Sequence, residues 1–224
     1  MEKYAVIVAG GSGTRMGAAK PKQFLLLQGK PMLWYTLTAF LSAFDDLQII
    51  LVLPAEHIEE GKSVAQITGS PARIEVVAGG PTRYQSVKNG LARISGDAMV
   101  FVHDGVRCLV THDLIHRCYA GALEKGNAVP AVGATDTIRI TAAGGNKQVD
   151  RDTVRIIQTP QTFLSATLRA AFEQAYNDAF TDEANVVEQL GVVINLVEGE
   201  ATNIKITKPL DLLIAEKVLE ARNT

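Results

Sequence analysis

Cysteine is scarce in this sequence, which has two cysteines, Cys108 and Cys118, among 224 residues. Two thiols supply neither a disulfide framework nor the ligand spacing of a metal site. We expect Cys108 to lie in a loop and Cys118 in a helix. We also expect both to be free thiols, as is usual for proteins of a reducing compartment.

Long apolar runs are also missing. The first apolar run, Ala5 to Val8, is short and leads into a glycine-rich loop, whereas a signal peptide leads into a cleavage site. No other stretch approaches the length that spans a bilayer. We therefore expect a soluble, cytoplasmic protein that does not associate with membranes.

The sequence also lacks an excess of charge of one sign. The formal net charge is -2, so bulk electrostatics gives no reason to expect a nucleic-acid partner or an anionic membrane surface. Any phosphate binding must therefore come from a few basic residues placed together locally.

The chain instead has enough apolar sequence for a substantial core, since apolar residues make up 47% of it. Its length fits one α/β domain, and we expect a single domain over residues 1–224. Short, almost continuously apolar runs predict strands that are buried on both faces of a parallel sheet. These strands are expected at Tyr4 to Ala9, Gln48 to Leu53, Arg73 to Val77, Ala98 to Val102, Asn127 to Val132 and Val192 to Leu196.

Amphipathic segments alternate with these strands and predict helices. They are expected at Met32 to Phe40, after Thr82 through Ile94, and at His112 to Glu124, Ser165 to Asn177 and Pro209 to Glu220. Alternation of this kind predicts an α/β protein, a Rossmann-like three-layer α/β/α sandwich with a mostly parallel sheet.

Residues 134–157 interrupt the alternation because they are polar and prone to form strands. Two such stretches flank a turn at Gly144, Gly145 and Asn146, which predicts a hairpin. A lone hairpin with so little apolar surface is not stable by itself. We favour a projecting β-arm that makes a dimer contact over a flap that folds back on the sheet.

The loop after the first strand carries the clearest chemical signal. It reads G-G-S-G-T-R-M-G from Gly10 to Gly17, which is neither the G-x-G-x-x-G pattern nor a P-loop. The basic residues Arg15, Lys20 and Lys22 follow in or just after it. Glycines let backbone amides approach a ligand, and cations offset charge on phosphates. The loop predicts triphosphate binding, with a solvated basic turn as the alternative.

The end of the fourth predicted strand reads His103-Asp104-Gly105-Val106-Arg107. A carboxylate there, Asp104, suits ribose hydroxyls or Mg²⁺, although an aspartate that caps a helix or turn is the alternative. Arg107 has the fork that grips a phosphate. We expect His103 to be structural.

A second glycine junction follows the third predicted strand. Backbone groups of Gly79 and Gly80, with Ser86, suit a base edge and a ribose, whereas Arg83 is expected to brace the turn. Lys205 lies between two isoleucines in a predicted short apolar strand. Periodicity leaves open whether Lys205 faces a site or the solvent.

Five blocks, in order, resemble those of the 2-C-methyl-D-erythritol 4-phosphate cytidylyltransferases. They are the glycine loop with the P-K-Q-F that follows it, V-H-D-G-V-R from Val102, T-D-E-A from Thr181, E-G at Glu198 and N-I-K-I-T-K-P from Asn203. The sister ribitol-5-phosphate cytidylyltransferases have similar blocks. This chain departs from the usual pattern at two positions. Relatives often have an acidic residue where this chain has Pro81, and many have a proline where it has Cys108.

The resemblance implies a role for each matching position. The implied catalytic residues are Arg15, Lys22 and Lys205. The implied nucleotide-binding residues are Ala9, Gly10, Gly11, Gly80, Ser86 and Asp104. The implied residues for the acceptor are Arg107, Thr137, Arg151 and Thr181, of which Thr137 and Arg151 come from the arm of the partner subunit in a homodimer.

The implied reaction is transfer of CMP from CTP to a sugar-alcohol phosphate, with Mg²⁺ as cofactor and pyrophosphate as the second product. We expect 2-C-methyl-D-erythritol 4-phosphate as acceptor, in non-mevalonate isoprenoid synthesis. Three alternatives stay open: a ribitol-5-phosphate cytidylyltransferase, a molybdenum-cofactor guanylyltransferase, and a regulatory module that binds CTP without turnover.

Overall fold

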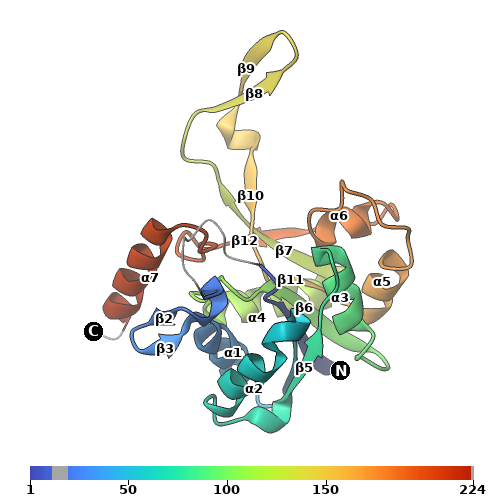
Figure 1. Ribbon diagram of the computed structural model, residues 1–224. Coiled ribbons are helices and arrows are strands. Elements are labelled where there is room, and N and C mark those ends of the chain that lie inside the picture. Colours follow the sequence, from blue (N-terminus) through green and yellow to red (C-terminus); the bar gives the residue numbers. More distant parts are fainter. Residues whose placement is uncertain (12–19, 223–224) are drawn as a thin grey trace.

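The computed structural model describes residues 1–11 and 20–222, and its centre is one twisted sheet (Figure 1). The strand order is β10-β7-β11-β6-β1-β4-β5, and β12 also pairs with β7. The strands of this sheet are β1 (Glu2–Val8), β4 (Leu47–Leu53), β5 (Ile74–Ala78), β6 (Ala98–Asp104), β7 (Asn127–Gly133), β10 (Arg155–Ile157), β11 (Gln161–Leu164) and β12 (Leu196–Glu198).

The sheet is mainly parallel. Strand β1 pairs in parallel with β4 and β6, β4 pairs in parallel with β5, and β12 does so with β7. Strands β10 and β11 run antiparallel to their neighbours. The carboxyl ends of β6, β1, β4 and β5 therefore lie side by side along one edge, which is where open α/β sheets bind ligands.

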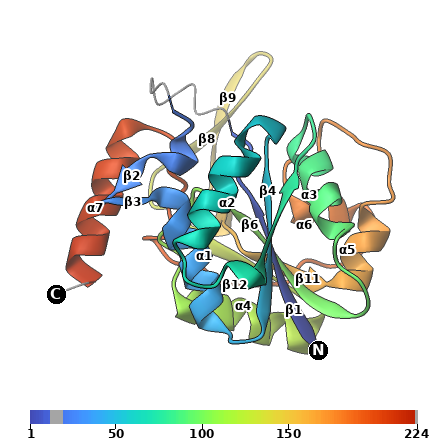
Figure 2. The ribbon, with the colours of Figure 1, turned by 60° about the horizontal axis from the view of Figure 1, so that its bottom comes forward.

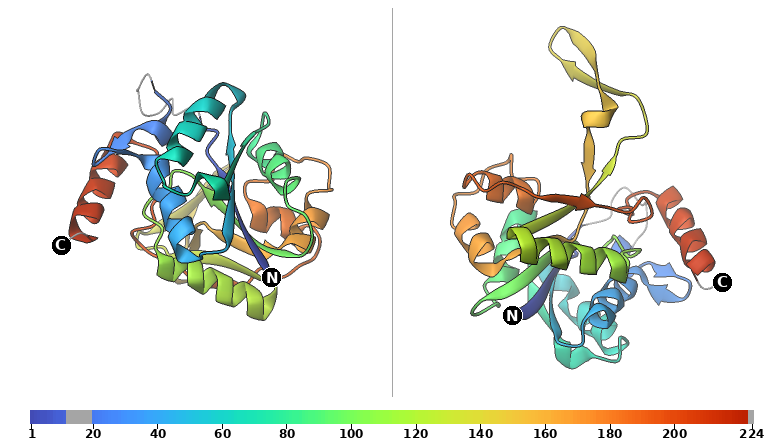
Figure 3. Two further views of the ribbon diagram at one scale, coloured as in Figure 1. Left: turned by 90° about the horizontal axis from the view of Figure 1, so that it is seen from below. Right: turned by 180° about the vertical axis from the view of Figure 1, so that it is seen from behind.

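Helices cover both faces of this sheet (Figure 3). On one face lie α1 (Met32–Ala43), α2 (Ile58–Gln66) and α4 (His112–Lys125), and on the other lie α3 (Arg83–Leu91), α5 (Ser165–Ala171) and α6 (Glu183–Glu188). Alternate residues of β1 serve the two cores, since Ile7 packs with the first group of helices and Val6 with the second. These three layers confirm the predicted α/β/α sandwich.

The last helix, α7 (Pro209–Arg222), packs away from the two main cores, at the side of the molecule (Figure 2). Its Ala215 and Leu219 meet Leu27 and Ile206 in a third small cluster. Within residues 1–11 and 20–222, the short strands β2 (Leu26–Leu27) and β3 (Lys30–Pro31) and four 3-10 helices lie in the connections. Those helices are η2 (Lys22–Phe24), η3 (Ala55–His57), η4 (Pro71–Arg73) and η5 (Arg151–Thr153).

Residues 134–157 form the predicted arm, which stands away from the sandwich (Figure 1). Its tip is a hairpin of β8 (Ile138–Ala142) and β9 (Gly145–Val149), closed by a turn in which Gly144 and Gly145 have φ of 99° and 145°. The hairpin is exposed along nearly its whole length. An isolated two-stranded ribbon is marginal in water, so we expect a partner to cover it.

Two sequence-based boundaries were wrong. The strand expected at Val192 to Leu196 begins only at Leu196, because pairing with β7 starts where Leu196 meets Val129. The helix expected at Ser165 to Asn177 ends at Ala171. Just past this end, the hydroxyl of Tyr84 donates to the carbonyls of Phe172 and Gln174.

Both cysteines are buried and free, Cys118 within α4 and Cys108 in the loop after β6. Burial raises the pKa of each thiol to about 12, so neither thiol is a nucleophile near neutral pH. Among residues 1–11 and 20–222, no helix combines the length and apolar character that crossing a membrane requires.

Candidate active site

A cavity of about 460 Å³ opens at the carboxyl ends of β1, β4, β5 and β6. Eight of the residues that the sequence assigns to the site line it. They are Ala9, Gly10, Gly11, Lys22, Gly80, Ser86, Asp104 and Lys205. The fold thus brings together side chains and backbone groups that lie up to 196 positions apart in the chain. Arg15 lies outside the described residues.

Lys22 enters this cavity from η2, which is attached to the end of β1. The side-chain amide of Gln23 donates to the carbonyl of Ala9 at 2.7 Å. Lys22 Nζ donates to the carbonyl of Ile206 at 2.9 Å, and Lys22 is only 8% exposed. This contact brings the Lys22 ammonium next to the segment that carries Lys205.

The junction between β5 and α3 forms a second wall. Thr82 caps α3 by accepting a hydrogen bond from the amide of Gln85. The hydroxyl of Ser86 accepts from the Gly80 amide at 3.1 Å and donates to the Thr82 carbonyl at 2.9 Å. A Cβ on Gly79 would lie 2.7 Å from Ser86 Oγ, so the tight turn needs glycine there. Ser86 therefore shapes the loop that presents Gly80.

Asp104, the last residue of β6, is the electrostatic centre of the cavity. Its Oδ2 lies 2.9 Å from Lys205 Nζ and 3.7 Å from Arg107 Nε, and its Oδ1 lies 3.4 Å from Arg83 Nε. Burial raises the pKa of this carboxyl, but Arg83 and Lys205 outweigh burial and hold the pKa well below its usual range. Asp104 is therefore ionised at neutral pH and surrounded by cations.

The backbone of Asp104 is held by a buried relay. Its amide donates to the hydroxyl of Thr159 at 3.1 Å, and that hydroxyl lies 2.9 Å from Nδ1 of His103. Nε2 of His103 lies 3.2 Å from the Arg107 carbonyl, so Nε2 carries the proton and Nδ1 accepts. Burial lowers the pKa of His103 to about 3, which keeps the ring neutral. This position agrees with the structural role expected for His103.

Arg83 makes a contact that the sequence did not indicate. It donates to both carboxylate oxygens of Glu183, at 2.5 and 3.0 Å. Glu183 is 1% exposed, whereas the Arg83 side chain is 28% exposed and lines the cavity. Burial by itself lowers the pKa of Arg83, and the carboxylates of Glu183 and Asp104 more than reverse that effect.

Arg107 lies beside the cavity, where it holds backbone segments together. It donates to the carbonyl of Asn203 at 2.8 Å and, more weakly, to that of Ile157 at 3.5 Å. It thus ties the segment before Lys205 to the base of the arm. The short strand predicted around Lys205 is wrong, because residues 203–207 form no strand and Ile206 is joined to Val106 by a single backbone bond.

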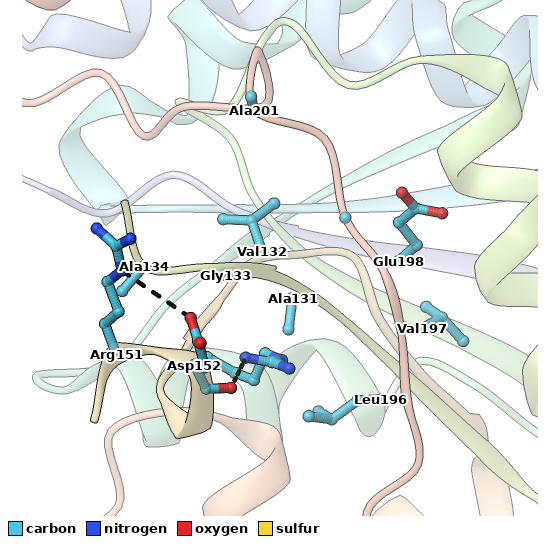
Figure 4. Close-up of a pocket in the computed structure, with 12 residues that line it drawn as sticks. Ala131, Val132, Gly133, Ala134, Arg151, Asp152, Leu196, Val197, Glu198 and Ala201 are labelled. Atoms are coloured by element: carbon cyan, nitrogen blue, oxygen red, sulfur yellow. Dashed lines mark hydrogen bonds and ion pairs between the residues drawn. The ribbon is translucent and has the colours of Figure 1, made fainter. Parts of the chain in front are cut away.

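The remaining acceptor-binding candidates lie elsewhere in this subunit. Thr137 and Thr181 are exposed, and neither lines the nucleotide cavity. Arg151 lines a second cavity, of about 770 Å³, at the base of the arm, where Figure 4 shows it across from Glu198. Arg151 donates to the Thr135 carbonyl at 3.0 Å and lies 3.9 Å from Asp152.

The donor set fits a divalent cation only if a ligand supplies most of the oxygens. Within residues 1–11 and 20–222, no three His, Cys, Asp or Glu side chains are arranged to hold a metal. The carboxylate of Asp104 faces the cavity and is available as one hard oxygen ligand, which suits Mg²⁺ carried by a triphosphate.

Comparison with known proteins fits this geometry. The sequence model of the 2-C-methyl-D-erythritol 4-phosphate cytidylyltransferase family matches residues 4–221. Curated members from Phocaeicola vulgatus and Bacteroides thetaiotaomicron are 42% and 44% identical to this chain. Each alignment covers 98% of this chain and all of the relative.

Solved structures give the same result. The 4-diphosphocytidyl-2C-methyl-D-erythritol synthase of Anaerococcus prevotii superposes with a TM-score of 0.84 at 26% identity, over 98% of both chains. The cytidylyltransferase of Thermus thermophilus superposes with a TM-score of 0.76 at 32% identity, over 98% of this chain and all of the other.

The cavity at the carboxyl edge of the sheet is lined by glycines, and Lys205, Arg83 and Arg107 surround one carboxylate there. Together with the matching relatives, this site places the chain in the class of nucleotidyltransferases. Within that class, the chain belongs to the 2-C-methyl-D-erythritol 4-phosphate cytidylyltransferase family.

Proposed function

We propose that the chain transfers CMP from CTP to 2-C-methyl-D-erythritol 4-phosphate and releases pyrophosphate. A phosphate oxygen of the acceptor attacks the α-phosphorus of CTP and forms the new P–O bond. The bond from the α-phosphorus to the bridging oxygen breaks, and pyrophosphate leaves with the electron pair. An ionised phosphate monoester is already a nucleophile, so the protein contributes positioning and charge stabilisation.

Each part of the cavity has a role in this proposal. The backbone at Ala9, Gly10, Gly11 and Gly80 binds the nucleotide, and Ser86 holds the Gly80 loop in shape. Lys22 and Lys205 offset the negative charge on the transferring phosphoryl group, together with Arg15. Asp104 binds ribose hydroxyls and offers one oxygen to Mg²⁺. The cation, when bound, neutralises charge on the triphosphate.

The convergence of Lys22 and Lys205 carries the proposal. The carbonyl of Ile206 binds Lys22 Nζ, Lys205 Nζ lies 2.9 Å from Asp104, and both lysines line the cavity that the glycine loops form. Lys205 is 44% exposed and pairs with Asp104, and a more highly charged triphosphate would compete for its ammonium group. Positive charge placed in this way offsets the negative charge of a leaving pyrophosphate.

For the acceptor we propose Arg107 and Thr181 from the same subunit, and Thr137 and Arg151 from the arm of a partner subunit. The support is that neither arm residue lines this subunit's nucleotide cavity, while the arm projects from the molecule. The assembly is then a homodimer. We propose a cytoplasmic location, which suits two buried free thiols.

The names of the matching relatives favour methylerythritol phosphate over ribitol phosphate as acceptor. A substrate panel tests this choice: the protein is incubated with each of the four nucleoside triphosphates and either acceptor, and pyrophosphate is measured. We expect release with CTP and methylerythritol phosphate. Faster release with ribitol phosphate would contradict the acceptor, and faster release with GTP would contradict the nucleotide.

A further inference from the structure

Glu183 is a buried acidic residue that the proposed reaction does not use. It lies in the first turn of α6 and is 1% exposed. Both of its oxygens accept hydrogen bonds from Arg83, in the bidentate arrangement that suits a guanidinium and a carboxylate. Burial raises the pKa of Glu183, and the Arg83 guanidinium opposes that shift.

Arg83 joins this buried carboxylate to the cavity. While Nη1 and Nη2 bind Glu183, Nε faces Oδ1 of Asp104 at 3.4 Å. The guanidinium is planar and rigid, so fixing two nitrogens on Glu183 also fixes the direction of the third. Oδ1 of Asp104 therefore meets a cation whose position is set by a residue of α6.

From this geometry we infer that Arg83 and Glu183 are a positioning pair for Asp104. Glu183 orients Arg83, and Arg83 orients the Asp104 carboxylate for the nucleotide. The acidic residue of the T-D-E-A block thus acts through Arg83 and does not touch a substrate. The inference rests on the proposed function, since it assumes that Asp104 contacts the nucleotide.

The fold does not need this charge to hold α6 in place. Asp182 already caps α6 by accepting from the amide of Asn185 at 2.9 Å. Gln161 of β11 donates to Asp182 at 2.9 Å and accepts from the amide of Ala184 at 2.8 Å. Because desolvating a buried ion pair roughly cancels its attraction, stability alone is a weak reason to keep one.

The other two cations near Asp104 are less suited to fix it. Lys205 is 44% exposed, and in the proposed reaction it serves the triphosphate. Arg107 is held on backbone carbonyls, with its Nε 3.7 Å from Asp104. Both of these cations face Oδ2, whereas Arg83 faces Oδ1, and Glu183 keeps Arg83 in place.

Steady-state kinetics of Glu183→Gln, Arg83→Lys and the double variant test the pair. Glutamine keeps the shape of Glu183 without its charge, and lysine keeps the charge of Arg83 without its fork. We expect kcat to fall roughly 10- to 100-fold in each single variant, since small displacements in a site have effects of that size. KM for CTP should rise by a smaller factor, because Asp104 contacts the ribose but the glycine loops also bind the nucleotide.

The double variant should be no more than about threefold worse than the poorer single variant, since the two residues act as one unit. Glu75→Gln is the matched control, because Glu75 pairs with Arg93 at 2.5 Å in an exposed ion pair away from the cavity. Its kcat should equal that of the wild type. Rates are referred to the folded fraction, measured by near-UV circular dichroism.

A lowered melting temperature with wild-type kcat per folded molecule in both single variants would overturn the inference, as would additive losses in the double variant. If Glu183→Gln does not fold, Arg83→Lys decides, because it leaves a cation between the two carboxylates. The proposed function fails separately, if the wild-type protein releases no pyrophosphate.

Discussion

At the residue scale, Lys22 is the cation most firmly built into the cavity. Its Nζ donates to the Ile206 carbonyl, and the whole residue is 8% exposed. If it stabilises the transition state and not bound CTP, Lys22→Ala should lower kcat roughly 10²- to 10³-fold with little change in KM, as seen when one such donor is removed. Steady-state pyrophosphate release measures both constants.

The matched control for this variant is Lys62→Ala, because Lys62 pairs with Glu59 on an exposed face of α2. Its kcat should not change. A tenfold weaker affinity for CTP in Lys22→Ala, with unchanged kcat, would contradict the role given to Lys22.

His103 predicts a pH dependence of stability. Its pKa falls from 6.5 in the unfolded chain to about 3 in the folded protein, because burial outweighs the neighbouring Asp104. Between these pH values the unfolded state binds more protons, so stability present above pH 6.5 is lost as pH falls. The slope from this group is roughly 1.4 kcal/mol per pH unit.

Urea unfolding at pH 7, 6 and 5 of the wild type and of His103→Gln measures this effect. The free energy of unfolding should fall more steeply with acid in the wild type, because glutamine does not titrate. Equal slopes for the two proteins would show that His103 does not contribute. Asp104, whose pKa is depressed, also causes a loss of stability in acid, but only at lower pH than His103.

Single residues also show where sequence reasoning is limited. Glycines after a strand, and the basic residues that follow them, indicate a phosphate site because the backbone chemistry is local. The Arg83–Glu183 pair joins residues 100 positions apart, and nothing in either segment indicates the other. An arginine at the start of a helix and an acid after an N-cap both have ordinary local explanations.

At the element scale, α3 lies close to the sheet at Gly90. A Cβ on Gly90 would lie 2.6 Å from Val6 Cγ1 and 3.1 Å from Val52 Cγ2. Although alanine favours helices over glycine, Gly90→Ala should destabilise the protein by about 1–3 kcal/mol, as overpacking usually does. Urea unfolding measures the difference. Gly133→Ala is the control, since a Cβ there meets nothing within 4 Å and should change stability little.

The strands of the sheet centre were predictable because they are apolar on both faces, as β6 is from Ala98 to Val102. Their order was not, since it depends on pairing between distant segments. The strand placed at Val192 to Leu196 was wrong because the local pattern carries no register. The start of β12 is set by the pairing of Leu196 with Val129 of β7.

At the scale of the whole molecule, the arm is exposed to solvent in this subunit. If the arm of one subunit completes the other's site, Lys22→Ala and Arg151→Ala should each be inactive and should complement each other when co-expressed. In a mixed dimer, one site has an intact Lys22 and receives an intact Arg151. Random pairing then restores roughly a quarter of wild-type activity, because half of the dimers hold one intact site of two.

Size-exclusion chromatography of the co-expressed pair should give the elution volume of a dimer. No regain of activity in a protein that elutes as a dimer would contradict an arm that acts on the partner's site. Mixing two preparations of Lys22→Ala is the control, and it should stay inactive.

The most direct test of the account is to identify the products of one reaction. The protein, CTP, Mg²⁺ and 2-C-methyl-D-erythritol 4-phosphate are followed by ³¹P NMR. The account predicts equal amounts of pyrophosphate and of a new cytidine diphosphate ester of methylerythritol. Pyrophosphate with free CMP and unchanged acceptor, or bound CTP without any product, would contradict cytidylyl transfer.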